Sequence, residues 1–205
     1  MVRTSRMVRV GVAVGLVMLV GIVAVPLTAQ SAVKFPLNPP TWYHGDQWTW
    51  KGPLGNLVTV QVASAATNGT YQLVGAAAAF APNGEWGEIL MGQREQVGNF
   101  LFIDWPLTYN KRWQDVGAKY TFVWRVGPIG TVTLPNGMKF TAVHLLCSVL
   151  THPAGNPPVQ KQVGTGSAWY APAAKTIVKI QFGPEAAWPQ GVRNKALTLV
   201  KYQLH

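Results

Sequence analysis

The sequence of 205 residues has little of what most catalytic and metal sites are built from, with one cysteine and four histidines. A single cysteine, Cys147, excludes an intramolecular disulfide. The histidines lack the His-x-His, His-x₃-His or His-Glu-x-x-His spacing that brings two ligands to one metal ion; they are His44, His144, His152 and His205. We therefore expect no metal and no cofactor. His144 and Cys147 stand three apart in a predicted strand, so their side chains should point to opposite faces of the sheet.

The chain has only seven acidic residues, so few carboxylates are available as catalytic acids or bases. Glycoside hydrolysis needs two carboxylates that face one bond. Glu85 and Glu88 lie on either side of Trp86, and an aromatic ring beside two acids is typical of a sugar-binding site. In a strand, however, side chains three positions apart point to opposite faces. The string that contains Ser167 lacks the second glycine of a nucleophile elbow. The sequence predicts that the protein is not an enzyme; a hydrolase acting on wall or glycan substrates through Glu85, Glu88 or Asp104 is the alternative.

Basic residues outnumber acidic ones in the chain as a whole, by 17 to seven. Arg3, Arg6 and Arg9 account for three of the 17 basic residues, so the rest of the chain has 14 basic and seven acidic residues, a net charge of +7. These basic residues are scattered singly, and the densest group is the pair Lys111 and Arg112. Without a basic stripe that could follow a phosphate backbone, we expect no nucleic-acid partner. A diffuse positive field suits an outward-facing protein that meets anionic lipid headgroups, wall polymers or acidic glycans.

The first 31 residues have the pattern of an export signal. Three arginines without an acid precede an apolar run from Val10 to Val25, and Ala29 and Ser31 are the small residues that a signal peptidase reads. We predict cleavage after Ser31, with Ala29 as second choice; the alternative is an uncleaved anchor, which would be the chain's membrane contact. No cysteine stands directly after the run, where a bacterial lipoprotein signal would carry it, so lipid attachment of that type is excluded. The predicted organisation is a signal peptide over 1–31, an extended lead-in over 32–40 and one β domain over 41–205, exported to the periplasm or the extracellular space.

The mature part of the chain alternates short β-prone runs with turn residues. Such regular spacing predicts a mostly β fold, a curled antiparallel sheet or half-barrel with at most one short helix, at Ala76 to Ala79. The predicted strands cover 48–50, 57–63, 71–74, 88–91, 100–103, 119–126, 131–134, 139–150, 166–170, 176–182 and 196–204.

Two hairpins stand out among these strands. Asn136 and Gly137 predict a type I′ turn, which needs two positive φ values, and Pro172 predicts a turn where its missing N–H costs nothing. The chain also contains an internal echo, since a Pro-Leu pair precedes a strand-opening tryptophan twice, first at Trp48 and again at Trp113. A duplicated β unit would produce such an echo.

Aromatic residues are the candidates for binding. The chain has nine tryptophans, and in a concave sheet such rings either fill the core or line a hydrophobic pocket. Trp48 and Trp50 lie two apart on one strand and should therefore share a face, while Trp169 adjoins Tyr170. We predict that these four residues contact a ligand, an apolar or amphipathic small molecule or an envelope component.

Several short motifs, in this order along the chain, resemble those of a group of uncharacterised secreted bacterial β proteins. That group opens with a Pro-Leu and Gly-x-x-Trp-x-Tyr pattern and later shows a Trp-Tyr-Ala-Pro…Val-Lys hairpin. The matching residues here are Gly45 to Trp50, Pro106-Leu107 with Trp113, Gly137 to Phe140, and Trp169 to Pro172 with Val178-Lys179. Trp50 replaces the tyrosine of the pattern, and Ala173 to Lys175 replace its glycine-containing turn. The resemblance implies a sheet similar to the half-barrels of periplasmic lipoprotein carriers, with no catalytic residues to carry over.

Three functions follow from the sequence. The first is a secreted or envelope-associated, non-enzymatic β domain that binds an apolar or amphipathic ligand or a partner protein. The second is the hydrolase named above, and the third is a purely structural surface module.

Overall fold

The computed structural model describes eight parts of the chain, all within the compact unit Ser31–His205. They are residues 32–52, 55, 57–65, 71–75, 103–116, 120–152, 159–183 and 196–205. The leader, the short helix predicted over 76–79, the strand predicted over 88–91, and Glu85 and Glu88 lie outside them. Nine strands are described: β1 (Gln47–Lys51), β2 (Leu57–Ala65), β3 (Tyr71–Gly75), β4 (Arg112–Val116), β5 (Tyr120–Thr133), β6 (Lys139–Thr151), β7 (Gln162–Ala171), β8 (Thr176–Phe182) and β9 (Ala196–Gln203).

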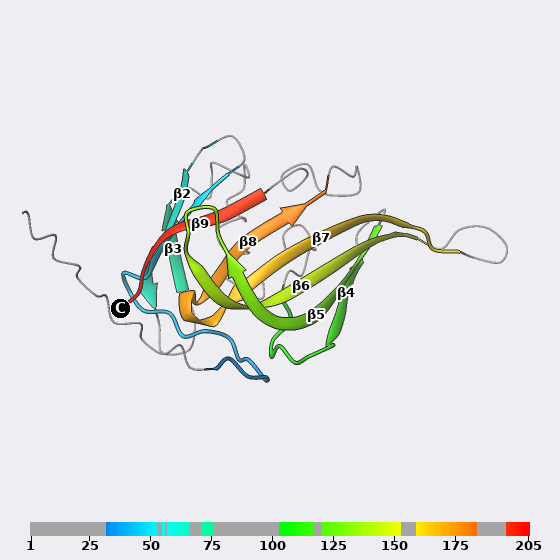
Figure 1. Cartoon of the computed structure of the whole chain (residues 1–205), viewed down its shortest axis with the longest axis horizontal. Coiled ribbons are helices and arrows are strands. Elements are labelled where there is room, and N and C mark those ends of the chain that lie inside the picture. The colour runs from blue at the N-terminus through cyan, green and yellow to red at the C-terminus, as the bar shows by residue number, and fades with distance from the viewer. Residues whose placement is uncertain are drawn as a thin grey trace, which may run out of the picture. The chain divides into compact units, whose positions relative to one another are not determined.

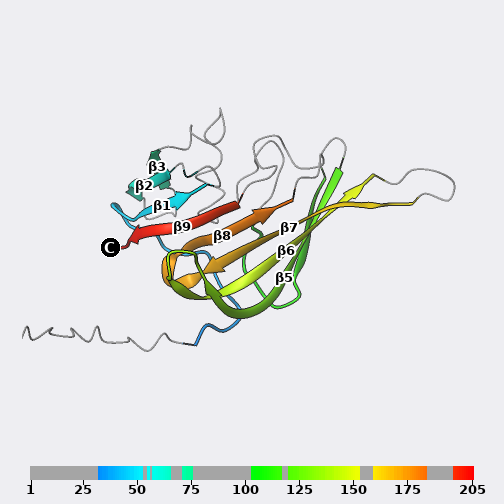
Figure 2. The ribbon, with the colours of Figure 1, turned by 45° about the horizontal axis from the view of Figure 1, so that its top comes forward.

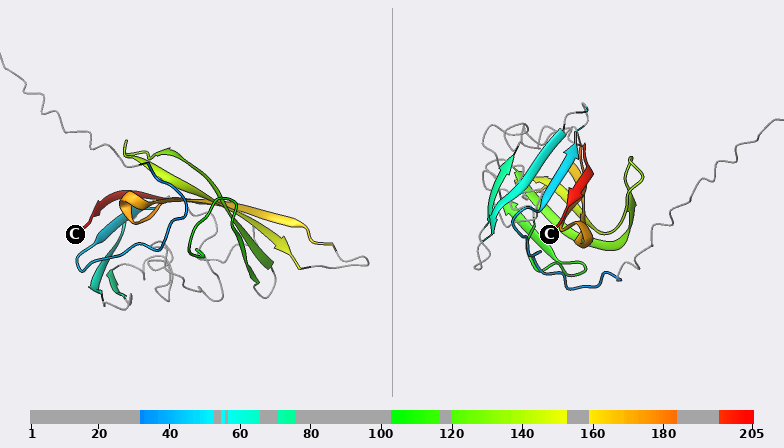
Figure 3. Two further views of the ribbon diagram at one scale, coloured as in Figure 1. Left: turned by 90° about the horizontal axis from the view of Figure 1, so that it is seen from below. Right: turned by 90° about the vertical axis from the view of Figure 1, so that its left-hand side faces the viewer.

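The strands form one antiparallel sheet in the order β3-β2-β1-β9-β8-β7-β6-β5-β4. The last strand, β9, is inserted between β1 and β8, so the first and the last strand are paired in the interior of the sheet (Figures 1 and 2). Figure 2 shows the strands fanned side by side, and Figure 3 shows how the sheet curves, most strongly at β5 and β6. Among the described strands, β3 and β4 are the two edges and do not pair with each other, so this sheet is open. The predicted mostly β, curled antiparallel sheet is confirmed.

Alternation along the strands separates two faces. The inner face carries Trp124, Leu145 and Ala168, which are all fully buried, whereas Arg125 and Leu146 belong to the outer face. Successive side chains in a strand point to opposite faces, and the alternating apolar residues of β5 and β6 bury one face. The core therefore lies on the inner face.

The prediction of two separate strands over 119–126 and 131–134 was wrong. One strand, β5, runs from Tyr120 to Thr133 and pairs with β6 over its whole length, with a register shift between Val126 and Ile129. Pro128 lies within that shift. Proline has no N–H to donate to a neighbouring strand, so regular pairing disfavours it. A bulge leaves residues unpaired, and a proline can lie there without the loss of a hydrogen bond.

The hairpin between β5 and β6 is where the sequence places it, but its turn is not type I′. Within this turn, only Gly137 has a positive φ, of 85°, and its N–H donates to the carbonyl of Leu134 at 2.9 Å. The proline ring fixes φ near −65°, which suits the first central position of a type I turn, so Pro135 occupies that position and Gly137 takes the left-handed conformation after it. The Nδ2 of Asn136 donates to the carbonyl of Leu199 at 3.3 Å, which ties the hairpin to β9.

The second predicted hairpin, β7 to β8, is also present. A short 3₁₀ turn, η2 (Pro172–Ala174), joins the strands, and Lys175 closes it in the left-handed conformation with a φ of 54°. This is the connection that Pro172 predicts.

The internal echo has a counterpart in the fold. Leu37 and Leu107, from the two Pro-Leu pairs, form an isolated antiparallel bridge with mutual N–H to carbonyl hydrogen bonds of 2.9 and 2.8 Å. Each tryptophan of the echo is the second residue of its strand, Trp48 in β1 and Trp113 in β4. The two lead-ins therefore run side by side although the strands that follow them are far apart in the sheet.

None of the helices in the described part of the chain has the length and apolar character needed to cross a membrane.

Candidate functional site

Two of the predicted ligand residues, Trp48 and Trp50, share the inner face of β1 and are fully buried. Their indole nitrogens donate to main-chain carbonyls, that of Trp48 to Ala174 at 2.6 Å and that of Trp50 to Ile177 at 2.8 Å. Trp42 does the same with the carbonyl of Lys175, at 3.2 Å. These tryptophans fill the core and fix the connection between β7 and β8.

The other two, Trp169 and Tyr170, are neighbours in β7 and face opposite ways. Tyr170 is buried against Trp105, with ring centroids 5.1 Å apart, and burial raises the pKa of its hydroxyl. Trp169 lies on the outer face, where its ring stacks on His144 at 4.7 Å and carries the Nζ of Lys179 at 4.7 Å. The structure thus does not gather the four predicted residues at one place, and their contact with a ligand stays a prediction.

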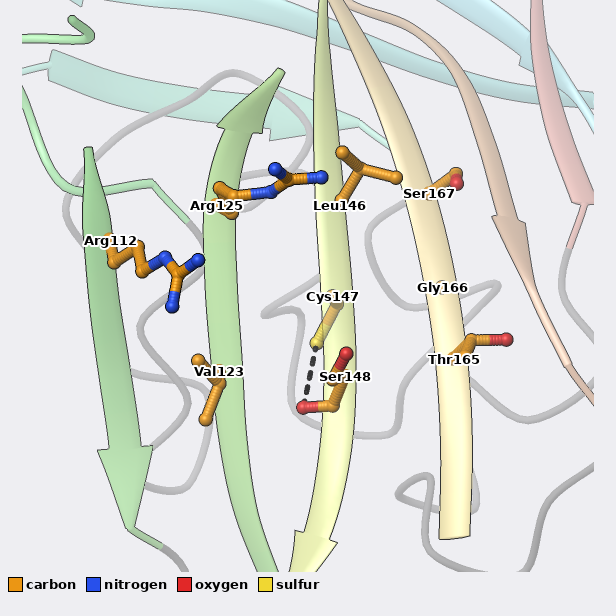
Figure 4. Close-up of a pocket in the computed structure, with 9 residues that line it drawn as sticks. All are labelled: Arg112, Val123, Arg125, Leu146, Cys147, Ser148, Thr165, Gly166 and Ser167. Carbon is orange, nitrogen blue, oxygen red and sulfur yellow. Dashed lines mark hydrogen bonds between the residues drawn. The ribbon is translucent and has the colours of Figure 1, made fainter. Parts of the chain in front are cut away.

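A hollow of about 530 Å³ lies on the outer face, across β4 to β7 (Figure 4). We call it the outer-face hollow. Two adjacent rows of cross-strand neighbours form it, because residues paired in register share a face. Arg112, Arg125, Leu146 and Ser167 make up one row, and Val123, Ser148 and Thr165 the other, with Cys147 and Gly166 between them.

Two arginines dominate the electrostatics of the outer-face hollow. Arg112 and Arg125 are exposed and directly paired across β4 and β5, and their side chains extend in the same direction, that of Arg112 toward β5 and that of Arg125 toward β6 (Figure 4). Like charges in that position destabilise a sheet. No acidic residue lines the hollow, and neither guanidinium has an ion-pair partner among the described residues. The hollow is a cationic site with hydroxyl groups on its far wall.

His144 lies next to the outer-face hollow, in β6, two residues before Leu146 and on the same face of the sheet. The Nε2 of His144 is 3.0 Å from the Oγ of Ser167, which itself lines the hollow. Burial lowers the pKa of His144, and the positive charges of Arg125 and Lys179 lower it further. In the empty site, His144 is therefore a neutral imidazole at neutral pH.

Cys147 and Asp104, the other candidate reactive residues that the structure describes, each contact groups of the protein itself. Cys147 is buried, its Sγ is 3.8 Å from the carbonyl of Ser148, and burial raises the pKa of its thiol. As predicted, Cys147 and His144 lie on opposite faces. Asp104 forms an ion pair with Lys111 at 3.0 Å. Across the ranges that the structure describes, no group of three or more His, Cys, Asp or Glu side chains is placed to hold a metal ion.

Sequence reasoning missed the outer-face hollow. The alternation of Val123 and Arg125 with buried Phe122 and Trp124 indicates that Arg125 points outward. What the sequence does not contain is the register of β4 against β5, which sets Arg112 directly opposite Arg125.

No family model and no curated protein matches the chain. Among solved structures, it is similar to the hypothetical lipoprotein YmcC from Escherichia coli K12, with 10% identity and a TM-score of 0.34 over 77% of this chain and 84% of that one. It is also similar to a "putative lipoprotein" from Parabacteroides distasonis, with 12% identity and a TM-score of 0.36 over 83% of this chain and all of that one.

Proposed function

We propose that this chain is an exported, envelope-associated, non-enzymatic β module that binds the anionic group of an amphipathic ligand in the outer-face hollow. The observation that carries the proposal is the cross-strand pair of Arg112 and Arg125, which faces solvent without an acidic partner among the described residues. A bound anion would offset their repulsion and accept charge-assisted hydrogen bonds, which are roughly twice as strong as neutral ones.

The surroundings of the pair suit an amphipathic molecule. Leu146 and Val123 supply apolar surface beside the guanidiniums, and Ser148, Thr165 and Ser167 supply hydroxyls. Charged and polar groups hold one end of such a ligand, while its apolar part contacts the two aliphatic side chains. The excess of basic over acidic residues in the chain favours the approach of an anion.

Ser167 and His144 resemble the serine and base of a hydrolase, but the third group that would orient the base is missing from the described residues. A serine nucleophile is activated by a base that a third group orients. Within the described ranges, no carboxylate is placed against His144, and its lowered pKa makes it a poor proton acceptor. We therefore assign the pair to binding.

Binding can be measured by isothermal titration with octanoate, dihexanoyl phosphatidic acid and uncharged octyl glucoside, all below micelle formation. We expect at least one of the anions to bind and octyl glucoside not to bind. Arg125→Gln should weaken anion binding roughly tenfold or more, because a hydrogen bond to a charged group contributes about 1.5–3 kcal/mol. Lys139→Gln, which removes one positive charge from an exposed site outside the hollow, is the matched control and should leave the affinity unchanged.

Equal affinities in the Arg125→Gln and Lys139→Gln proteins, or no binding of either anion, would overturn the proposal and leave a structural module. Hydrolysis of a p-nitrophenyl ester that disappears in Ser167→Ala would instead establish an enzyme.

A further inference from the structure

The outer-face hollow offers more hydrogen-bond donors than one carboxylate can use. Each guanidinium has five N–H donors, and a single arginine already satisfies a carboxylate through two parallel bonds. Here a second arginine and the hydroxyls of Ser148, Thr165 and Ser167 are added. A tetrahedral oxyanion, with three or four oxygens pointing in different directions, fits such a donor set better than a planar carboxylate.

Charge also favours a ligand with two negative charges. Arg112 and Arg125 carry two permanent positive charges in the hollow, and none of the described residues that line it is acidic. A monoanion would leave one of these charges uncompensated.

Ser167 links the hollow to His144. A hydroxyl has one proton to donate. When neutral His144 accepts that proton at Nε2, Ser167 has none left for a ligand. Protonated His144 has N–H groups on both ring nitrogens, so Nε2 donates to Oγ at the observed 3.0 Å contact, and the Ser167 proton is free for an anion.

The groups facing His144 come from four strands. Arg125 of β5 and Lys179 of β8 are positive, β7 presents the neutral Ser167 and Trp169, and β6 itself adds the apolar Leu146. In the described ranges none of these groups is a carboxylate, so the empty site disfavours a third positive charge. A bound dianion reverses that balance, because it compensates Arg125 and attracts the imidazolium.

We propose that the outer-face hollow selects a dianionic tetrahedral oxyanion of the phosphate-monoester or sulfate class, and that His144 is a positioning residue that takes up one proton from water as the dianion binds. The proposal rests on the proposed function and adds its ligand class and its pH dependence. Since the dianion raises the pKa of His144, affinity increases as the pH falls through the pKa of the complex, and it levels off below the pKa of the empty site.

The test is an NMR titration of the four histidine Cε1 protons between about pH 5 and 8, where imidazoles titrate. Inorganic sulfate is the probe, because it keeps both charges over this range. Chloride and acetate at the same ionic strength control for screening. We expect sulfate to raise the pKa of His144 more than acetate or chloride does. The Cε1–H chemical shifts of His44, His152 and His205, which do not line the hollow, are the internal references.

Two variants separate this inference from the proposed function. In Arg125→Gln, sulfate should no longer shift the pKa of His144. In His144→Gln, sulfate should still bind, with an affinity that no longer depends on pH. If Arg125 is required for binding but acetate shifts His144 as much as sulfate does, or sulfate does not shift it, the inference fails and the proposed function stands. If no anion binds through Arg125, both fail.

A separate experiment tests whether the oxyanion belongs to a lipid headgroup or to a soluble molecule. Glycerol 3-phosphate and dihexanoyl phosphatidic acid present the same phosphate monoester without and with acyl chains. Tighter binding of the lipid identifies a lipid headgroup as the ligand, and equal binding identifies a soluble monoester. Weaker binding of both than of acetate would overturn the proposed class.

Discussion

At the scale of single residues, Trp48 combines a buried ring with a hydrogen bond that an aliphatic side chain could not make. The ring is fully buried, and its Nε1 donates to the carbonyl of Ala174 at 2.6 Å. Trp48→Ala removes both contributions, so we expect the free energy of unfolding to fall by about 3–5 kcal/mol. Urea unfolding of the two proteins measures the difference.

Trp48→Phe is the companion variant, because it keeps an aromatic ring and removes the indole N–H. It leaves a buried carbonyl without its donor, at a cost of about 1–3 kcal/mol. If Trp48→Ala instead lost much less than 3 kcal/mol, and if tryptophan emission shifted on adding phospholipid, the ring would line an open ligand pocket, as the aromatic clustering of the sequence predicts.

At the scale of elements, the β5–β6 turn depends on one backbone conformation. Gly137 has a φ of 85°, and beyond its two chain neighbours no residue lies within 4 Å of where its Cβ would be. The cost of a side chain there is therefore backbone strain alone. We expect Gly137→Val to destabilise the protein by about 1–3 kcal/mol, measured as a lower melting temperature.

The matched control is Gly130→Val, in the same hairpin. Gly130 has equally open space and no positive φ, and valine favours a strand. An effect of Gly130→Val as large as that of Gly137→Val would show that the loss does not come from the turn.

The same hairpin shows how far the sequence predicts the fold. Its strands follow from alternation and its position from Asn136 and Gly137, but Pro135 decides the turn type, because its fixed φ takes the first central position. Gly127 and Pro128 likewise predict the end of a strand. In the structure, β5 continues through a bulge at these residues, because it stays paired with β6 on both sides. Local patterns thus predict the strands and hairpins. The outer-face hollow depends on register between strands and on the curvature of the sheet, which no local pattern contains.

At the scale of the whole molecule, Asp46 joins three distant parts of the chain. Its carboxylate is fully buried and accepts hydrogen bonds from the N–H of Tyr43 at 3.0 Å and the N–H of His205 at 2.7 Å. It also forms an ion pair with Lys175, in the β7–β8 connection, at 3.2 Å. The beginning of β1, the end of the chain and the β7–β8 connection therefore meet at one side chain.

Removing this carboxylate should loosen all three segments together. Asp46→Ala leaves Lys175 and two main-chain N–H groups without their acceptor, and breaking a buried ion pair costs about 3–5 kcal/mol; the exposed part of Lys175 places the expected loss at the lower end of that range. Asp46→Asn keeps an oxygen acceptor for the N–H of His205 and should cost less. Urea unfolding gives the two free energies, and amide hydrogen exchange should show faster exchange in β1, β9 and the β7–β8 connection of Asp46→Ala. Faster exchange confined to the residues around Tyr43 would mean that Asp46 orders only its own turn, and that β9 is held by its pairing with β1 and β8 alone.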